Sequence, residues 1–141
     1  MSRVHSFHDT PILMYPALAN AELAVMELLW EAETLTSRAI REVLYADSPK
    51  AQHGTVQRLL QRLEDKGFVQ RDKTSAVHRF RAMITRAAYG GSELERLAKK
   101  LAGGSVAPLL TNLIEENRLS PEELARLRKL LESESQGELT A

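Results

Sequence analysis

The stretch from His53 to Gly67 constrains the fold more than any other part of the chain. Four apolar residues in it recur at the spacing of a helix with one buried face: Val56, Leu59, Leu60 and Leu63. Gly67 stands where a glycine ends a helix in the left-handed conformation. The opposite face carries long amide and guanidinium side chains, namely Gln57, Arg58, Gln61 and Arg62. The pattern therefore predicts an amphipathic helix over residues 53–66.

The polar face of this helix is open to two interpretations. Gln and Arg side chains form paired hydrogen bonds with base edges, and Arg also neutralises phosphate. The same residues would equally suit the solvated face of an ordinary core helix. The flanking chain has to decide between them.

The charge distribution favours the first interpretation. The 141-residue chain has a formal net charge of zero, but residues 50–86 contain nine Lys or Arg and only three Asp or Glu. A DNA-facing element on an otherwise neutral protein produces such a local excess of positive charge.

Two helices are expected before the polar helix. The first covers residues 20–31, with Asn20 as its N-cap. The second helix has Thr36 as its N-cap, and Leu35 and Ile40 are expected to contact each other across the start of the helix. Val43 is among the residues expected to be buried in the second helix.

The apolar period changes to two after Gly67. Residues 68–71 and 77–83 are predicted to form two strands joined by a polar turn, with Phe80 pointing inward and Arg79 and Arg81 on the other face. Three helices followed by a basic hairpin is the order of a winged helix-turn-helix. In that fold the third helix enters the major groove and the hairpin lies over the DNA backbone.

The C-terminal third is predicted to be helical. A connecting helix starts near Thr85, and Gly90–Gly91 is expected to interrupt it or delay its start. Two short helices follow the glycines at 103 and 104, and the second opens with a strong start signal at Ser120. Both are too short to persist alone in water. They either fold back on the winged domain or pair with the same helices of a second chain.

Pairing is favoured, because a helix-turn-helix reads a two-fold operator as a dimer. The expected dimer interface consists of apolar residues from the two short helices: Val106, Leu109, Leu110, Leu113, Ile114, Leu124, Leu127 and Leu131.

The expected fold class is mostly α with a small β-hairpin, in which a helical dimerisation domain follows an N-terminal winged helix-turn-helix. The expected division is a flexible arm at 1–17, the winged domain at 18–84, the connecting and dimerisation helices at 85–132, and a flexible tail at 133–141.

Several other classes of protein are not expected. The chain has no cysteine and no apolar run of membrane-spanning length, so a cytoplasmic protein is expected, without thiolate metal sites and without contact with a membrane. His5 and His8 lack a further ligand nearby, and no metal or cofactor is predicted. An enzyme is not expected, because His53 and His78 have no paired nucleophile or base beside them.

The chain resembles the BlaI/MecI/CopY-type penicillinase repressors. The resemblance covers about Leu18 to Leu131. It rests on Ala21–Met26 with Leu29–Trp30, on Thr55–Leu63 with Lys66–Gly67, and on Gly103–Leu110 through Leu119–Leu124. It implies a homodimeric repressor that binds a dyad operator in double-stranded DNA through the helix at 53–66 and the wing at 68–83.

The resemblance also implies contacts. The recognition helix would contact the operator through Thr55, Gln57, Arg58, Gln61 and Arg62, and the wing would touch the backbone at Lys73. The complete set of expected DNA-binding residues is Gln52, His53, Thr55, Gln57, Arg58, Gln61, Arg62, Lys73 and Arg79.

Two features depart from the family. Resistance-associated members are inactivated by cleavage of an Asn-Phe bond in the connecting helix, where this chain has Glu95-Arg96. Copper-sensing members carry C-terminal Cys-x-Cys motifs, which this chain lacks. An upstream sensor or protease is therefore left unassigned.

Two rival functions stay open on the sequence alone. A winged module used only for protein–protein contacts would show no salt-dependent binding to duplex DNA, whereas a DNA binder loses affinity steeply with salt. A ligand-gated regulator would need a pocket between the domains.

Overall fold

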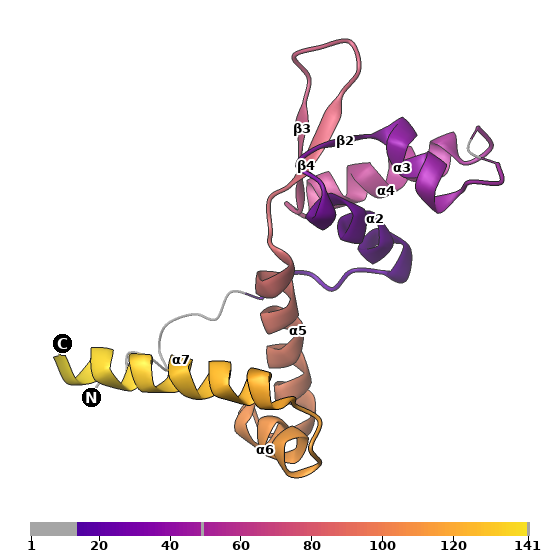
Figure 1. Cartoon of the computed structure of the whole chain (residues 1–141). Coiled ribbons are helices and arrows are strands. Elements are labelled where there is room, and N and C mark those ends of the chain that lie inside the picture. Colours follow the sequence, from indigo (N-terminus) through magenta and orange to yellow (C-terminus); the bar gives the residue numbers. More distant parts are fainter. Residues whose placement is uncertain (1–13, 49, 141) are drawn as a thin grey trace. The chain divides into compact units, whose positions relative to one another are not determined.

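The computed structural model describes residues 14–48 and 50–140 (Figure 1). The chain divides into two compact units, the first ending at Leu94 and the second beginning at Glu95. Each unit has its own architecture.

Between residues 14 and 85, apart from the undescribed residue 49, the first unit contains three helices and a small sheet (Figure 1). The helices are α2 (Asn20–Glu31), α3 (Ser37–Leu44) and α4 (His53–Asp65), and the strands are β2 (Leu35–Thr36), β3 (Val69–Asp72) and β4 (Arg79–Ala82). The unit also includes the first part of α5 (Arg86–Leu101). The predicted fold class, mostly helical with a small antiparallel hairpin, is confirmed.

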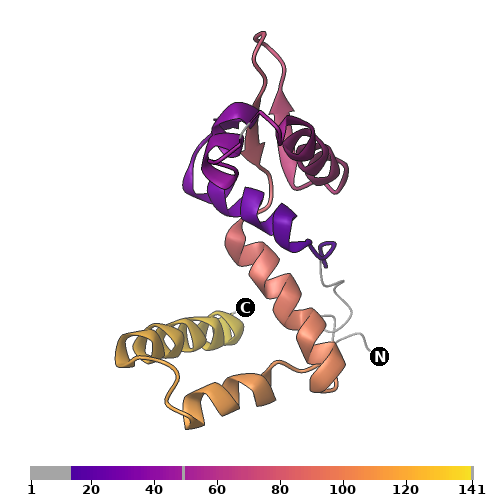
Figure 2. The ribbon, with the colours of Figure 1, turned by 90° about the vertical axis from the view of Figure 1, so that its right-hand side faces the viewer.

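The sheet has the order β2-β4-β3, and both pairings are antiparallel. In the hairpin Val69 pairs with Ala82, and Asp72 pairs with Arg79. The strand β2 was not predicted as a strand; it places Leu35 beside Phe80. The hairpin loop projects beyond the helices of the unit in two perpendicular views (Figure 1, Figure 2). This arrangement of helices, sheet and projecting loop is a winged helix-turn-helix.

The core lies between α2, α3, α4 and the inner face of the sheet. The apolar face predicted for α4 is confirmed, because all four of its apolar residues are buried, and Phe68 and Phe80 complete the cluster from the hairpin. One expectation is wrong. Val43 is 62% exposed, because the short helix α3 turns Ile40 into the core and leaves Val43 on its outer side.

The helices begin and end at the predicted capping residues, except that the N-cap of α2 is one residue earlier than predicted. Thr36 caps α3 by accepting a hydrogen bond from the Ala39 N–H, as predicted. Gly67 ends α4 with φ +82°, also as predicted. Asn20 is not the N-cap of α2 but its first helical residue; the cap is Ala19, whose N–H donates to the Glu22 carboxylate.

The start of α5 belongs to the winged unit. Tyr89 and Ser92 are both buried. The Tyr89 hydroxyl accepts a hydrogen bond from the Leu18 N–H, and the Ser92 hydroxyl accepts one from the Tyr15 N–H. The predicted interruption at Gly90–Gly91 is wrong, because α5 continues through both glycines. Of the expected N-terminal arm, residues 1–13 lie outside the described part of the chain.

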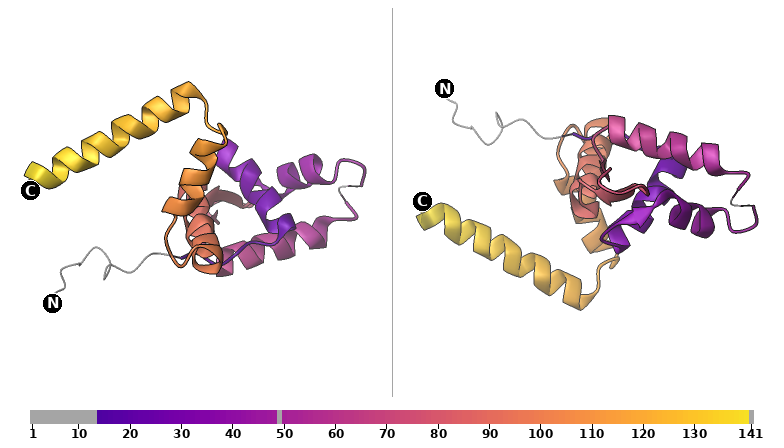
Figure 3. Two further views of the ribbon diagram at one scale, coloured as in Figure 1. Left: turned by 90° about the horizontal axis from the view of Figure 1, so that it is seen from below. Right: turned by 90° about the horizontal axis from the view of Figure 1, so that it is seen from above.

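The second unit consists of the rest of α5 with α6 (Ala107–Glu115) and α7 (Pro121–Thr140). The predicted start of α7 is confirmed: Ser120 Oγ accepts from the Glu123 N–H, and the Glu123 carboxylate accepts from the Ser120 N–H. The expected end near Glu132 is passed, and α7 continues to Thr140 as one helix (Figure 3). Within 14–48 and 50–140, no helix is both long and apolar enough to cross a bilayer.

Candidate nucleic-acid interface

The exposed face of α4 carries four of the predicted DNA-binding residues. His53, Arg58, Gln61 and Arg62 are exposed, and Arg58 and Gln61 lie opposite the buried stripe. The Gln61 amide donates to Asp65 Oδ1 at 2.9 Å, so this side chain has a partner within the helix. Arg58 and Arg62 therefore offer the exposed guanidinium groups of this face.

The beginning of α4 holds two further predicted residues. Gln52 immediately precedes the helix, and its side-chain oxygen accepts a hydrogen bond from the Thr55 hydroxyl at 2.9 Å. Both side chains are half-buried. The pair fixes the first turn of α4, the part of a recognition helix that contacts base edges.

Gln57 departs from the expected outer face. It is half-buried, and its Nε2 donates to Ser37 Oγ on α3 at 3.1 Å. Its amide links α3 to α4 in this structure, and this bond uses one of its two donors.

A buried ion pair joins α4 to α2, and sequence reasoning missed it. Glu22 is only 2% exposed, and its carboxylate accepts hydrogen bonds from Lys66 Nζ and the Ala19 N–H, both at 2.8 Å. Burial alone would raise the pKa of Glu22, but these bonds and the charges of Lys66 and Arg62 hold it below its ordinary value. The position of Glu22 on the apolar stripe of α2 was the available signal.

The tip of the wing is organised by Asp72. Its Oδ1 accepts hydrogen bonds from the Thr74 hydroxyl at 2.7 Å and the Thr74 N–H at 2.9 Å, and both lower the pKa of Asp72. An aspartate that bonds its own chain two residues on is a common turn device. Lys73 is exposed inside this turn.

The other predicted wing residue, Arg79, lies apart from α4. Arg79 and Arg81 are exposed on the face of the sheet that Phe80 does not share, as predicted. Their guanidinium groups donate to Thr34 Oγ1 and Gln70 Oε1. The structure brings Lys73 to the wing tip but places Arg79 on the outer face of the sheet, away from the helices.

Arg71 connects the wing to the recognition helix, and it was not predicted. Its guanidinium donates twice to the Glu64 carboxylate, at 3.1 and 3.3 Å, and lies 3.3 Å from His78 Nδ1. It also lies over the Phe80 ring, 4.7 Å from the centroid. The link fixes where β3 sits against α4.

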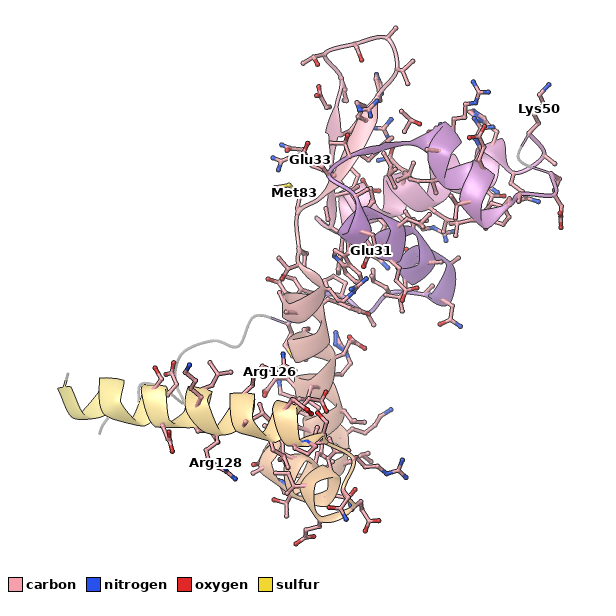
Figure 4. All side chains as sticks on the ribbon, viewed as in Figure 1. Glu31, Glu33, Lys50, Met83, Arg126 and Arg128 are labelled. Atoms are coloured by element: carbon pink, nitrogen blue, oxygen red, sulfur yellow. The ribbon has the colours of Figure 1, made fainter. Side chains whose placement is uncertain are left out.

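The expected dimer residues lie on the second unit. An apolar groove of about 480 Å³ is lined by Leu110, Ile114, Leu124, Leu127 and Leu131, with Arg128 and Glu132 beside them. Arg126 and Arg128 leave α7 on opposite sides (Figure 4). Leu113 borders a separate hollow with Asn112, Glu116 and Arg118, and Val106 and Leu109 are half-buried.

A metal site is not evident in the described part of the chain, where no three His, Asp or Glu side chains come close enough to share an ion.

Known proteins similar to this chain identify its family. Residues 18–133 match the penicillinase repressor family. The penicillinase repressor of Bacillus licheniformis is 28% identical over 120 residues, covering 83% of this chain and 91% of that protein. The methicillin resistance regulatory protein MecI of Staphylococcus aureus (strain N315) is 26% identical over 117 residues, covering 81% of this chain and 92% of that protein.

Among solved structures, the chain is similar to the DNA-binding domain of the repressor BlaI in solution. The identity is 27% and the TM-score 0.46, with 52% of this chain and 89% of that one covered. The family match spans most of the sequence, both the winged unit and the apolar helices of the second. The chain belongs to the penicillinase repressor family.

Proposed function

We propose that this protein is a sequence-specific DNA-binding transcriptional repressor, acting in the cytoplasm as a homodimer on a two-fold operator. The observation that carries the proposal is the exposed polar face of α4 beside a projecting wing, in a chain of the penicillinase repressor family. Membership of a repressor family also supports the expectation that the protein is not an enzyme.

The roles within the interface follow from exposure. Arg58 and Arg62 have the reach and the paired donors to read guanine in the major groove. His53, Thr55 and Gln61 border the same face, and Gln52 holds its first turn. Lys73 at the wing tip suits a phosphate contact, which positions a protein on DNA without reading sequence. Arg79 would contribute only where the duplex bends round the sheet.

The second unit supports the homodimer. Leu110, Ile114 and Leu127 are 39–47% exposed and line the same groove. A contiguous apolar surface of this kind marks an interaction site. A second copy presents the same leucines, and a two-fold axis through the grooves would bury both sets together.

Selection from a random duplex library tests the proposal. The full-length protein should enrich an inverted repeat whose half-site centres lie about one helical turn, roughly 10 bp, or a multiple of that, apart. The variant carrying Arg58→Ala and Arg62→Ala is the control and should enrich no common sequence. Recovery of unrelated duplexes by the parent would refute sequence-specific binding, and a single unrepeated half-site would refute the dimeric mode.

A further inference from the structure

A cleft opens within the winged unit between the start of α3, the middle of α4 and the wing. Its volume is about 360 Å³, and the residues that line it include Ser37, Arg38, Arg41, Gln57, Arg71 and His78. All six belong to one compact unit. The cleft thus lies directly between the recognition helix and the hairpin.

The lining is cationic and rich in hydrogen-bond donors. It contains three guanidinium groups and an imidazole, and none of the described side chains along it is acidic. The only ion pair of Arg38 that the structure records is with Glu42, four residues on, at 3.1 Å. Both partners are mostly exposed, at 79% and 55%, so this pair contributes little and releases Arg38 readily. Arg41 is half-buried in the same wall.

The opposite wall is held rigidly. Arg71 is only 15% exposed, bound to Glu64 and stacked on Phe80, so its guanidinium keeps one position. A cleft with a fixed guanidinium on one wall and the readily released Arg38 on the other suits a compact anion. Arginine forks match phosphate oxygens in geometry as well as in charge.

We propose that this cleft binds a phosphate group, which in the repressor is one of the operator backbone, with Arg38 and Arg41 as its contacts and Arg71 as a positioning residue. The proposal rests on the proposed DNA-binding function. When the exposed face of α4 enters the major groove and Lys73 touches the backbone beyond, the strand between these two contacts passes the cleft. The sequence alone had assigned backbone contact to Lys73 and its neighbours on the wing.

Salt-dependent titration against duplex DNA tests the proposal. Arg38→Ala and Arg41→Ala are compared with the parent on the selected operator and on an unrelated duplex, and Arg86→Ala is the matched control. Arg86 is exposed in the same unit but pairs with Glu31 and lies over Trp30, outside the cleft. Thermal unfolding of each variant checks the fold, and exposed Arg38 keeps the test decisive if Arg41→Ala unfolds.

The expected result is a change in salt dependence without a change in base preference. Each cleft variant should flatten the slope of log K against log salt by about 0.9 per subunit, which is about 1.8 for the homodimer, and should weaken binding roughly sixtyfold at 0.1 M salt, equally on both duplexes. Arg86→Ala should match the parent. Parent-like slopes for both cleft variants would overturn the proposal, as would an altered base preference.

A second arm separates the cleft from the proposed function. Inorganic phosphate is titrated into the parent while the amide resonances of Ser37 and His78 are followed by NMR. Saturable shifts that are lost in Arg38→Ala would support a phosphate site even if the parent binds no duplex, in which case only the repressor function fails. If the parent binds duplex DNA and both cleft variants keep the salt slope of the parent, only the cleft proposal is refuted. A parent that binds neither duplex nor phosphate overturns both.

Discussion

At the scale of single residues, α4 divides its polar side chains between two tasks. Gln57 and Gln61 already have partners in the protein, on Ser37 and Asp65. Arg58 is exposed, and no hydrogen bond or ion pair joins it to another residue in the described part of the chain, so its five donors can serve a ligand. The guanidinium groups, rather than the amides, should therefore dominate base discrimination.

Replacing these arginines should weaken operator binding without unfolding the protein. We expect Arg58→Ala and Arg62→Ala each to cost roughly 1–3 kcal/mol per half-site of the selected operator, because each removes a paired contact to a base. Both side chains are exposed, so the thermal midpoint should change little. Gel-shift titration beside Arg86→Ala checks the prediction. Parent-like affinity for both variants would show that α4 is not the reading helix.

The Glu22–Lys66 pair should matter for stability. Glu22→Gln keeps the size of the side chain and an oxygen for the Ala19 N–H but removes the charge that Lys66 binds. We expect the free energy of unfolding at pH 7 to fall by about 1–3 kcal/mol. Chemical denaturation measures it, with Glu31→Gln as control, because Glu31 makes only an exposed pair with Arg86.

The same pair predicts a pH dependence. The pKa of Glu22 in the folded protein lies below its ordinary value of 4.5, so its contribution is complete above about pH 4.5 and is lost as the pH falls through the folded pKa. The stability difference between the parent and Glu22→Gln should therefore disappear under acidic conditions. A difference that stays constant down to pH 3 would mean that the ionised carboxylate is not its source.

Sequence patterns predicted the exposed side chains of the candidate site better than its hydrogen-bonded ones. Periodicity alone placed Arg58, Gln61 and Arg62 on the outer face of α4, and the structure confirms their exposure. The turn of Gln57 toward Ser37 and the link from Arg71 to Glu64 depend on how α3 and β3 pack against α4. No spacing along the chain contains that information.

At the scale of elements, the two kinds of glycine in this chain should respond oppositely to substitution. Gly67 has φ +82° at the end of α4, and Gly90 lies within α5; a Cβ at either position would meet no atom within 4 Å. The room for a side chain is therefore the same at both positions, and the expected effects of substitution differ because the backbone conformations differ.

We expect Gly67→Ala to destabilise the protein by about 1–2 kcal/mol, because alanine is strained in the left-handed region. Gly90→Ala should stabilise it by about 0.5–1 kcal/mol, because alanine has less conformational freedom to lose in a helix. Denaturant midpoints measured side by side decide the matter. Equal effects of both substitutions would contradict the helix end at Gly67 or the continuity of α5.

The sequence predicted elements well where they were long and poorly where they were short. α4 and the hairpin carry enough residues for a period to show, whereas β2 has two residues and no period at all. β2 exists because Leu35 and Thr36 pair with Phe80 and Arg79, some 45 residues away. The exposure of Val43 has a different cause, since the single apolar stripe of α3 is turned so that Ile40 and Leu44 face the core and Val43 lies at its solvent edge.

At the scale of the whole molecule, the apolar groove of the second unit links assembly to operator binding. We expect Ile114→Glu with Leu127→Glu to dissociate the dimer, because two carboxylates without partners would be buried at the contact. Affinity for a two-half-site operator should collapse, since each monomer loses the partner that raises its local concentration on DNA. Binding to a single half-site should fall much less. Sedimentation with both DNA lengths measures the two effects.

Arg126→Glu is the matched control for that experiment. It introduces the same total change of charge as the double variant, but on the side of α7 away from Arg128 and the groove (Figure 4). It should leave the dimer intact. If the double variant also stays dimeric, the subunit contact lies elsewhere.

The contacts of the chain divide it at a point within α5 rather than at the end of the hairpin. A boundary after residue 84 follows from the end of the hairpin, whereas the structure divides at Leu94. The difference arises because the first turns of α5 bury Tyr89 and Ser92 among residues from the beginning of the chain. Because α5 belongs to both units, its helical sequence pattern is continuous and does not mark where one unit ends and the other begins.

The bonds to Tyr89 and Ser92 have a consequence for synthesis. They join residues 71 and 77 positions apart, and both acceptors lie after the wing. A nascent chain that has emerged as far as Thr85 holds every residue of α4 and the hairpin but offers no hydroxyl to the amides of Tyr15 and Leu18. Contacts between distant segments form slowly, because a long loop must close first. We therefore expect the winged unit to become protease-resistant on the ribosome only after the first turns of α5 have left the exit tunnel.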